Sequence, residues 1–324
     1  MSRRLLAPLA ALSLAFAAPV AAAEPLRILA TVGMIADVAE AVGGDCVTVE
    51  TLIAADVDPH EYSARPSDIR RLERAELILY VDFALEEQLA HALERFAERV
   101  PTLGVVGAAF ERSELLADPD APEAIDPHVW MDARKWARIA PVIAEAIAAA
   151  QPGCATAARA GADAYAAQLR ALHDWVSEAI ATIPEGRRLL VTAHDAFEYF
   201  SAAYGIEASE AIEGISTTTE ASIADIRAVA DFVVARQVPA VFVETTVSPR
   251  TIEALVQEVR ARGHEVEIGG ALYSDGMGAA GTAEGTYIGM IRANTATIVA
   301  ALGGRLPDWP EALADWAEEW SVRD

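Results

Sequence analysis

The sequence predicts an α/β protein of two lobes, each with a parallel sheet flanked by helices, joined by a single long rigid helix. Short apolar runs rich in β-branched residues alternate with longer amphipathic segments, and this alternation occurs in two separate series. Between the two series lies an alanine-rich stretch, residues 154–183, that lacks proline and carries apolar residues every three or four positions.

Each series supplies one lobe. The expected strands of the first series are 26–31, 46–53, 76–81 and 102–107. Those of the second series are 187–193, 206–212, 240–245 and 264–272. We therefore expect an N-terminal lobe at 24–152, a linking helix at 153–184 and a C-terminal lobe at 185–324. Thirty helical residues would span roughly 45 Å, whereas a flexible hinge would be short and rich in glycine or serine, so limited hinge motion is expected.

The first 23 residues have the pattern of a secretory signal peptide. Arg3 and Arg4 precede an apolar run, and Ala21-Ala22-Ala23 supply the small residues of a cleavage site. No cysteine directly follows that site to carry a lipid, so we expect a soluble periplasmic protein without a lipid anchor. Cys46 and Cys154 are the only cysteines. An oxidising compartment would permit them to pair, but two cysteines make no metal framework and show no CxxC spacing, and we expect neither a disulfide nor a cysteine metal site.

The charge balance excludes some partners. Without the two arginines of the leader, 23 basic side chains stand against 49 acidic ones, a formal net charge of −26. Such a surface repels nucleic acid and anionic lipid and attracts cations. After the leader, no apolar run is long and uninterrupted enough to cross a membrane.

The position of each histidine relative to the strands separates the candidates for a site. In an open parallel sheet, ligands bind beyond the carboxyl ends of the strands, where loops converge. His60, His128 and His194 all follow strands at that edge, as does Asp275, and Glu244 ends a strand there. The other three histidines do not meet this criterion, and we expect them to be structural or solvent-exposed: His91, His173 and His264.

Taken singly, each of the three selected histidines has an ordinary structural explanation. His60 follows a turn, His128 precedes a helix, and His194 is next to Asp195 in a possible Asx turn. Taken together, three imidazoles and the Asp275 carboxylate at strand ends of two facing lobes form a tetrahedral donor set. Neutral imidazole nitrogen and carboxylate oxygen suit a borderline divalent ion such as zinc.

Several stretches of the chain are distinctive in combination: "DVDPHEYSARPSDIRRLERAELILY", "DPHVWMD", "VTAHDAFEYF", "VFVETTVSP" and "LYSDGMG". With them the mature chain resembles the solute-binding receptors of zinc and manganese ABC transporters. The resemblance implies two lobes joined by one rigid helix, delivery of the ion to a membrane permease, and no enzymatic activity. It also implies that the ion is held by His60, His128, His194 and Asp275.

The metal is expected to be zinc as the transported ligand, with manganese or iron as the alternative. Manganese receptors of this family commonly have glutamate at the position of His194, and three nitrogen donors with one carboxylate favour zinc. Many zinc receptors of the family also carry a histidine-rich loop, yet residues 107–125 contain no histidine. Ion collection would then depend on the main site or on another protein, so a periplasmic metallochaperone is a further candidate partner. We expect a monomer.

Three acids near the ligands are candidates to accept hydrogen bonds from the outer imidazole nitrogens: Glu61, Asp195 and Glu244. Binding requires neutral histidines, so metal affinity is expected to fall as the pH drops through about 6 to 7. We expect the glycine-rich segment 276–285 to be mobile and to order when metal binds.

Three other functions agree less well with the sequence. A periplasmic zinc hydrolase, with Glu61 or Glu244 as base, would need an open coordination position, which four protein ligands do not leave. A surface adhesin is disfavoured because no adhesive module is present. A receptor for an organic ligand such as a siderophore would not need four converging metal donors.

Overall fold

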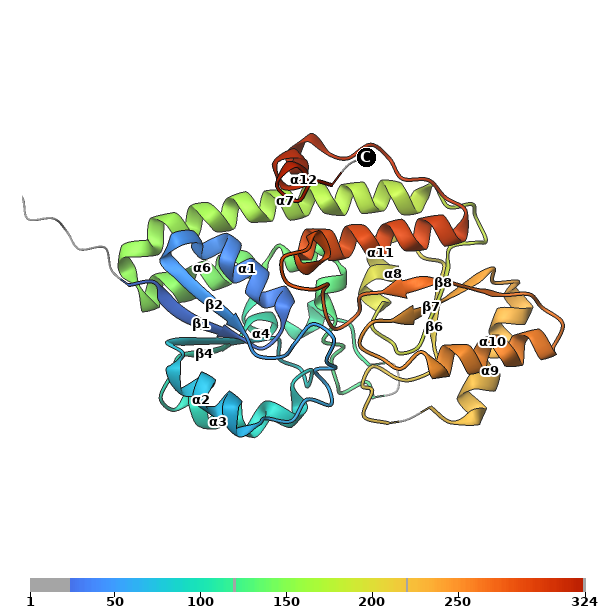
Figure 1. Ribbon diagram of the computed structural model, residues 1–324, viewed down its shortest axis with the longest axis horizontal. Coiled ribbons are helices and arrows are strands. Elements are labelled where there is room, and N and C mark those ends of the chain that lie inside the picture. The colour runs from blue at the N-terminus through green and yellow to red at the C-terminus, as the bar shows by residue number, and fades with distance from the viewer. Residues whose placement is uncertain (1–23, 119–120, 220, 323–324) are drawn as a thin grey trace, which may run out of the picture.

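The computed structural model describes residues 24–118, 121–219 and 221–322. Two α/β lobes lie side by side, and one long helix, α7 (Ala155–Ala181), runs along both of them (Figure 1). This is the predicted fold class. The expected signal peptide lies outside the described residues. Among the helices described, none is long and apolar enough to cross a membrane.

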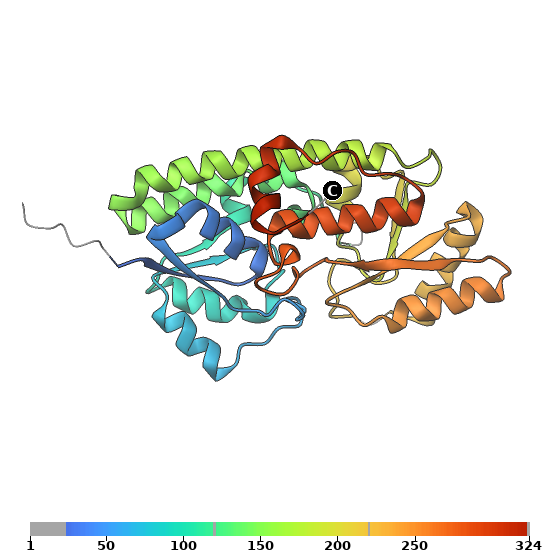
Figure 2. The ribbon, with the colours of Figure 1, turned by 45° about the horizontal axis from the view of Figure 1, so that its top comes forward.

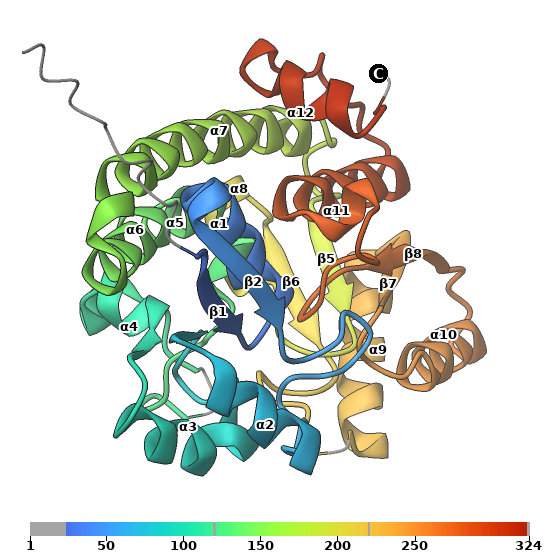
Figure 3. The ribbon, with the colours of Figure 1, turned by 60° about the vertical axis from the view of Figure 1, so that its left-hand side comes forward.

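The N-terminal lobe contains a parallel four-stranded sheet in the order β2-β1-β3-β4. Its strands are β1 (Leu26–Ala30), β2 (Val47–Thr51), β3 (Leu77–Tyr80) and β4 (Thr102–Gly104). One face is covered by α1 (Gly33–Gly43) and α6 (Ile139–Ala150), and the other by α2 (Pro66–Arg74) and α3 (Ala90–Ala97) (Figure 3). The two short helices α4 (Val105–Ala109) and α5 (Ala133–Trp136) complete the lobe. The central strands β1 and β3 are almost wholly buried, as expected of parallel strands covered on both faces.

The C-terminal lobe repeats this plan with two parallel strand pairs, β5-β6 and β7-β8, in which β5 lies beside β7. The strands are β5 (Leu189–Thr192), β6 (Ala208–Ala211), β7 (Ala240–Glu244) and β8 (Glu267–Leu272). Its helices are α8 (Glu198–Tyr204), α9 (Ile223–Arg236), α10 (Arg250–Ala261) and α11 (Tyr287–Leu302). The chain then forms α12 (Ala314–Glu319), which lies over α7 in Figure 1.

Helix α7 connects the lobes as a continuous element. Its 27 residues span roughly 40 Å. It packs against α1 and α6 of the N-terminal lobe and against α8 and α11 of the C-terminal lobe (Figure 2). The main apolar core also extends from one lobe into the other. This shared core supports the expectation of limited hinge motion, because parting the lobes would expose apolar surface to water.

Trp130 takes part in two of the hydrogen bonds between the lobes. The Trp130 indole Nε1 donates to the carbonyl oxygen of Ser274 at 2.9 Å, and the Tyr287 hydroxyl donates to the Trp130 carbonyl at 2.6 Å. Trp130 is fully buried. These bonds hold the segment that carries His128 against the segment that carries Asp275.

The expectation that the two cysteines stay apart is wrong. Cys46 and Cys154 form a disulfide that joins the turn before β2 to the start of α7. The bond lies at the amino end of β2, the edge of the sheet away from the loops that follow the strands. A separation of 108 residues gives no indication of proximity, so only the fold brings the two sulfur atoms together.

The glycine-rich segment 276–285 is buried at its start, at Gly276 and Met277, whereas residues 279–282 are exposed. A Cβ atom on Gly276 would stand only 2.1 Å from the carbonyl oxygen of Ala55 in the other lobe. Only glycine therefore allows the two backbones to touch directly after Asp275.

Candidate metal centre

Four side chains from the two lobes converge between the carboxyl ends of the sheets: His60, His128, His194 and Asp275. His60 follows β2 and His128 lies in the segment after β4, whereas His194 follows β5 and Asp275 follows β8. Each offers one ligand atom, and these atoms all lie within 4.8 Å of one another. The structure thus brings together the four side chains that the sequence selects.

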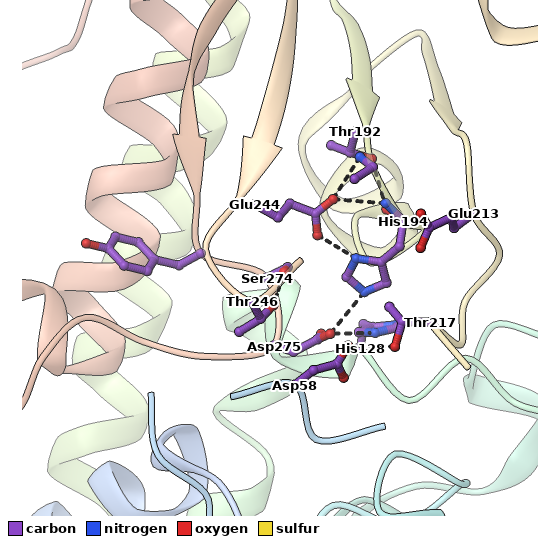
Figure 4. Close-up of polar contacts among 12 residues, drawn as sticks. Asp58, His128, Thr192, His194, Glu213, Thr217, Glu244, Thr246, Ser274 and Asp275 are labelled. Atoms are coloured by element: carbon purple, nitrogen blue, oxygen red, sulfur yellow. Dashed lines mark hydrogen bonds and ion pairs between the residues drawn. The ribbon is translucent and has the colours of Figure 1, made fainter. Parts of the chain in front are cut away.

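The distances between donor atoms are those of groups that face a common centre. Nε2 of His194 lies 3.0 Å from Oδ2 of Asp275, and Nε2 of His128 lies 3.2 Å from Oδ1 (Figure 4). Nε2 of His60 lies 3.4 Å from Nε2 of His128 and 3.8 Å from Oδ2 of Asp275. Two imidazole nitrogens at such a separation are readily explained if both are ligands of one ion.

The centre is closed to water, since none of the four side chains is more than 2% exposed. Among the described residues, neither carboxylate oxygen of Asp275 accepts a hydrogen bond of acceptable geometry. A buried carboxylate without hydrogen bonds is costly unless a cation compensates it. The donor atoms present therefore fit a divalent metal ion.

The repeated Asp-Pro-His triplet is the same local turn used twice. Asp58 Oδ1 accepts the backbone N–H of His60 at 2.8 Å, and Asp126 Oδ1 accepts that of His128 at 2.9 Å. An aspartate that bonds its own backbone two residues on forms an Asx turn. In both copies this turn fixes the backbone that carries a ligand.

Asp126 has a second role that the sequence analysis missed. Its Oδ1 also lies 2.7 Å from Nδ1 of His128, so the carboxylate orients the ring and leaves Nε2 free for the metal. The position of Asp126 two residues before His128, in a triplet already singled out, was the available signal.

Glu244 is placed as the sequence predicts, at the end of β7 beside His194. Oε1 of Glu244 accepts the backbone N–H groups of Ala193 and His194 at 2.8 and 2.9 Å. Its Oε2 lies 2.5 Å from Nδ1 of His194 (Figure 4). One carboxylate thus fixes both the backbone and the ring of this ligand.

The other two predicted outer partners do not reach an imidazole. Glu61 is exposed and forms no hydrogen bond with a ligand ring among the described residues. Asp195 is half-buried and faces a cavity of about 650 Å³ together with Glu198. His60 accordingly has no carboxylate on its outer nitrogen, because its Nδ1 is buried without a partner among the residues described.

The three remaining histidines lie outside the centre, as expected. His91 is exposed and pairs with Glu94. Nε2 of His264 lies 2.9 Å from the carbonyl oxygen of Val238. His173 sits among surface-type residues in the sequence, but it is buried, and its Nδ1 lies 3.3 Å from Asp132. Its role is structural.

The protonation of the three ligand imidazoles differs with their surroundings. Burial lowers the pKa of His60 to about 3, and the Asp275 carboxylate only partly opposes this. Burial also acts to lower the pKa of His128, but Asp126 and Asp275 outweigh it and raise the pKa to about 9. The pKa of His194 is likewise raised well above its usual value, because Glu244 and Asp275 outweigh burial.

The Asp275 carboxylate is kept ionised. Burial acts to raise its pKa, but the neighbouring imidazoles of His194 and His128 outweigh burial and hold the pKa well below the usual range. Without metal, the protons on these imidazoles balance the charge of the carboxylate, and a bound cation would replace those protons.

Glu244→Gln tests whether the outer carboxylates act on the metal. Since Glu244 holds both the ring and the backbone of His194, we expect metal affinity to fall about 10- to 100-fold. Isothermal titration with zinc measures the change. Glu61→Gln is the matched control and should leave the affinity unchanged, because Glu61 is exposed. Equal losses in both variants would show that net charge, and not the contact with His194, sets the affinity.

Comparisons with known proteins identify metal-binding relatives of this chain. Residues 28–301 match the family model described as zinc-uptake complex component A, periplasmic (ZnuA). The chain is 40% identical to the zinc-binding protein TroA of Treponema pallidum, over 89% of this chain and 92% of that protein. It is 39% identical to the manganese-binding lipoprotein MntA of Bacillus subtilis, over 86% and 90% of the two chains.

A solved structure shows the same fold. The periplasmic zinc-binding protein TroA from Treponema pallidum superposes with a TM-score of 0.83 at 39% identity, covering 87% of this chain and all of that one. The likeness spans both lobes. The chain therefore belongs to the ZnuA family, whose members are metal-binding receptors of ABC transporters and not enzymes.

Proposed function

We propose that the protein is a periplasmic high-affinity zinc receptor that delivers the ion to the permease of an ABC transporter for uptake. The observation that carries this proposal is the buried set of three imidazoles and one carboxylate, whose ligand atoms lie within 4.8 Å of one another. Four protein donors close the coordination sphere of zinc, whereas a catalytic zinc keeps one position for water. The site is thus suited to holding an ion as cargo.

Zinc is favoured over manganese and iron by the donor atoms. Imidazole nitrogen suits zinc, whereas oxygen donors suit manganese, and this site has three nitrogens and one carboxylate. The relatives differ in the metal that their names give, since one is named a zinc-binding protein and another a manganese-binding lipoprotein. The Irving–Williams order also places zinc above manganese at a site of this kind.

We also propose a division of the chain into domains. The domains are a leader at 1–23, lobes at 24–152 and 185–324, and a linking helix at 153–184. The only two cysteines are bonded to each other, which supports a soluble receptor without a lipid on cysteine. We further propose that it acts as a monomer and that a periplasmic metallochaperone contributes to its loading.

Zinc affinity should rise with pH. Metal can bind only when the proton on Nε2 of His128 and of His194 has left, and each displaced proton changes the affinity about tenfold per pH unit. The raised pKa of His128, about 9, moves the onset of this competition above the range of about 6 to 7 that the sequence alone indicates. His60, with a pKa of about 3, stays neutral and does not contribute near neutral pH.

Zinc titrations at about pH 6 and about pH 8 measure this dependence, and repeating them in buffers of different ionisation enthalpy counts the protons released. Tighter binding at the higher pH, with proton release, is expected. Equal affinity at both values would contradict the assignment of His128 and His194 as ligands.

Uptake by cells tests the transport function. A strain that lacks the gene should grow poorly when zinc is chelated, and the wild-type gene should restore growth and zinc accumulation. A gene carrying Asp275→Ala should fail to do so while producing the same amount of protein in the periplasm. Full restoration by the variant would overturn the proposed function.

A further inference from the structure

One hydrogen bond joins the loop that carries His60 to the opposite lobe. The hydroxyl of Thr217, in the segment between β6 and α9, donates to Oδ2 of Asp58 at 2.6 Å. Thr217 is buried although its neighbours Ser216 and Thr218 form only an exposed contact with each other. The Thr217 side chain therefore points away from solvent and contacts the other lobe.

The Asp58 carboxylate thereby connects a metal ligand to the C-terminal lobe. Its Oδ1 accepts the backbone N–H of His60 at 2.8 Å, and its Oδ2 accepts the Thr217 hydroxyl. Among the described residues, Asp58 has no basic partner, so Thr217 is the donor that it meets across the interface. Figure 4 shows both residues beside Asp275 and His128.

The position of the His60 ring depends on its loop more than the positions of the His128 and His194 rings depend on theirs. The rings of His128 and His194 are oriented by Asp126 and Glu244, but Nδ1 of His60 has no partner among the described residues. Its ring is therefore placed by the backbone of its loop. Within the described chain, the Thr217 contact is the one hydrogen bond that ties this loop to the C-terminal lobe.

The same contact stands at an opening between the lobes. Asp58 and Thr217 line, from opposite sides, a cavity of about 380 Å³ that also includes Glu213, Thr246 and Thr251. Loss of this hydrogen bond would remove the polar contact that holds the His60 loop to the C-terminal lobe on this side.

We propose that the hydrogen bond between Thr217 and Asp58 is a latch that holds the His60 loop closed over the bound ion and slows its dissociation. This inference rests on the proposed function, because it concerns the lifetime of the metal complex. The bond fixes the His60 loop in the arrangement that brings the four donor side chains together, so its loss should act mainly on dissociation and leave association nearly unchanged. Thr217 is thus a positioning residue and does not touch the metal.

Stopped-flow measurement of zinc release into excess chelator tests the latch. Thr217→Val keeps the shape of the side chain and removes the donor, and it should speed dissociation about 10-fold, the effect of one hydrogen bond to a charged group. The association rate should stay within about 2-fold of the wild type. Thr217→Ser retains the hydroxyl and should restore slow release.

Thr218→Val is the matched control, because it removes a hydroxyl from the same loop that contacts only Ser216. It should release zinc at the wild-type rate. Wild-type release from Thr217→Val, or equal acceleration in Thr218→Val, would overturn the latch while leaving the receptor function intact. A wild-type protein that binds no metal would overturn both proposals.

Discussion

Asp275→Ala is expected to lower zinc affinity by more than about 100-fold, the upper end of the loss that follows removal of an outer hydrogen-bond partner. Asp275 is the only carboxylate among the four ligands, and its oxygens lie 3.0 and 3.2 Å from the imidazoles of His194 and His128. Without it, the ion would meet three imidazoles, two of which have raised pKa values, with no negative charge at the centre. Competition with a chromophoric chelator measures affinities over this range.

At about pH 8, where Asp195 is mostly ionised, Asp195→Asn controls for the loss of charge near the centre. Asp195 follows His194 in the chain but contacts no ligand ring, and its own pKa is raised to about 7 by burial and by neighbouring Glu198 and Asp126. Its replacement should change zinc affinity by less than about 3-fold, as expected of a residue outside the ligand set and its hydrogen-bond partners. If Asp275→Ala binds zinc as tightly as Asp195→Asn, Asp275 is not a ligand.

Removing the disulfide is expected to lower the free energy of unfolding by about 2–5 kcal/mol, because the cross-link restricts the unfolded chain. Cys46 and Cys154 are separated by 108 residues, and loops of this length place the expected effect near the upper end of that range. Urea unfolding of the Cys46→Ala, Cys154→Ala double variant, compared with the wild type, gives the value. Reductant should destabilise the wild type and leave the variant unchanged.

Zinc affinity is the internal control for that experiment. The disulfide lies at the amino end of β2, whereas the metal ligands lie beyond the carboxyl ends of the strands. The folded variant should therefore bind zinc about as the wild type does. Unfolding that is insensitive to reductant would show that the bond is not formed in the purified protein.

The strand-end rule explains why the ligands could be predicted. The period of the apolar residues gives the strands and their order along the chain, and parallel strands bring their carboxyl ends to one edge. His60, His128, His194 and Asp275 all follow strands of this kind, and they meet in the structure. His264, which lies just before β8, correctly falls outside the site.

Element ends and outer contacts could not be predicted in the same way. The strand expected at 102–107 stops at Gly104, because Val105 and Val106 are buried in α4, which packs against α6. Apolar valines serve equally in a buried strand or a buried helix, so their sequence does not distinguish the two. The disulfide could not be predicted either, because it requires the turn before β2 to lie next to the start of α7, and only the tertiary fold places them together.

The sequence also could not show which carboxylates contact the imidazole rings of the ligands. Glu61 is adjacent to a ligand in the sequence yet points to solvent, whereas Asp126, two residues before its ligand, contacts the ring. Neighbouring residues in a loop point in different directions, and an Asx turn folds the side chain of its first residue back over the third. Nearness in the sequence therefore wrongly indicated that Glu61 contacts a ligand ring, and it did not identify the contact made by Asp126.

The most direct test of the central claim is a competition between zinc and manganese for the purified mature protein, preceded by analysis of its metal content. We expect one metal ion per chain and displacement of bound manganese by an equimolar amount of zinc, because three imidazole nitrogens and one carboxylate favour zinc. Manganese that binds more tightly than zinc under this competition would contradict the assignment of zinc as the transported ion.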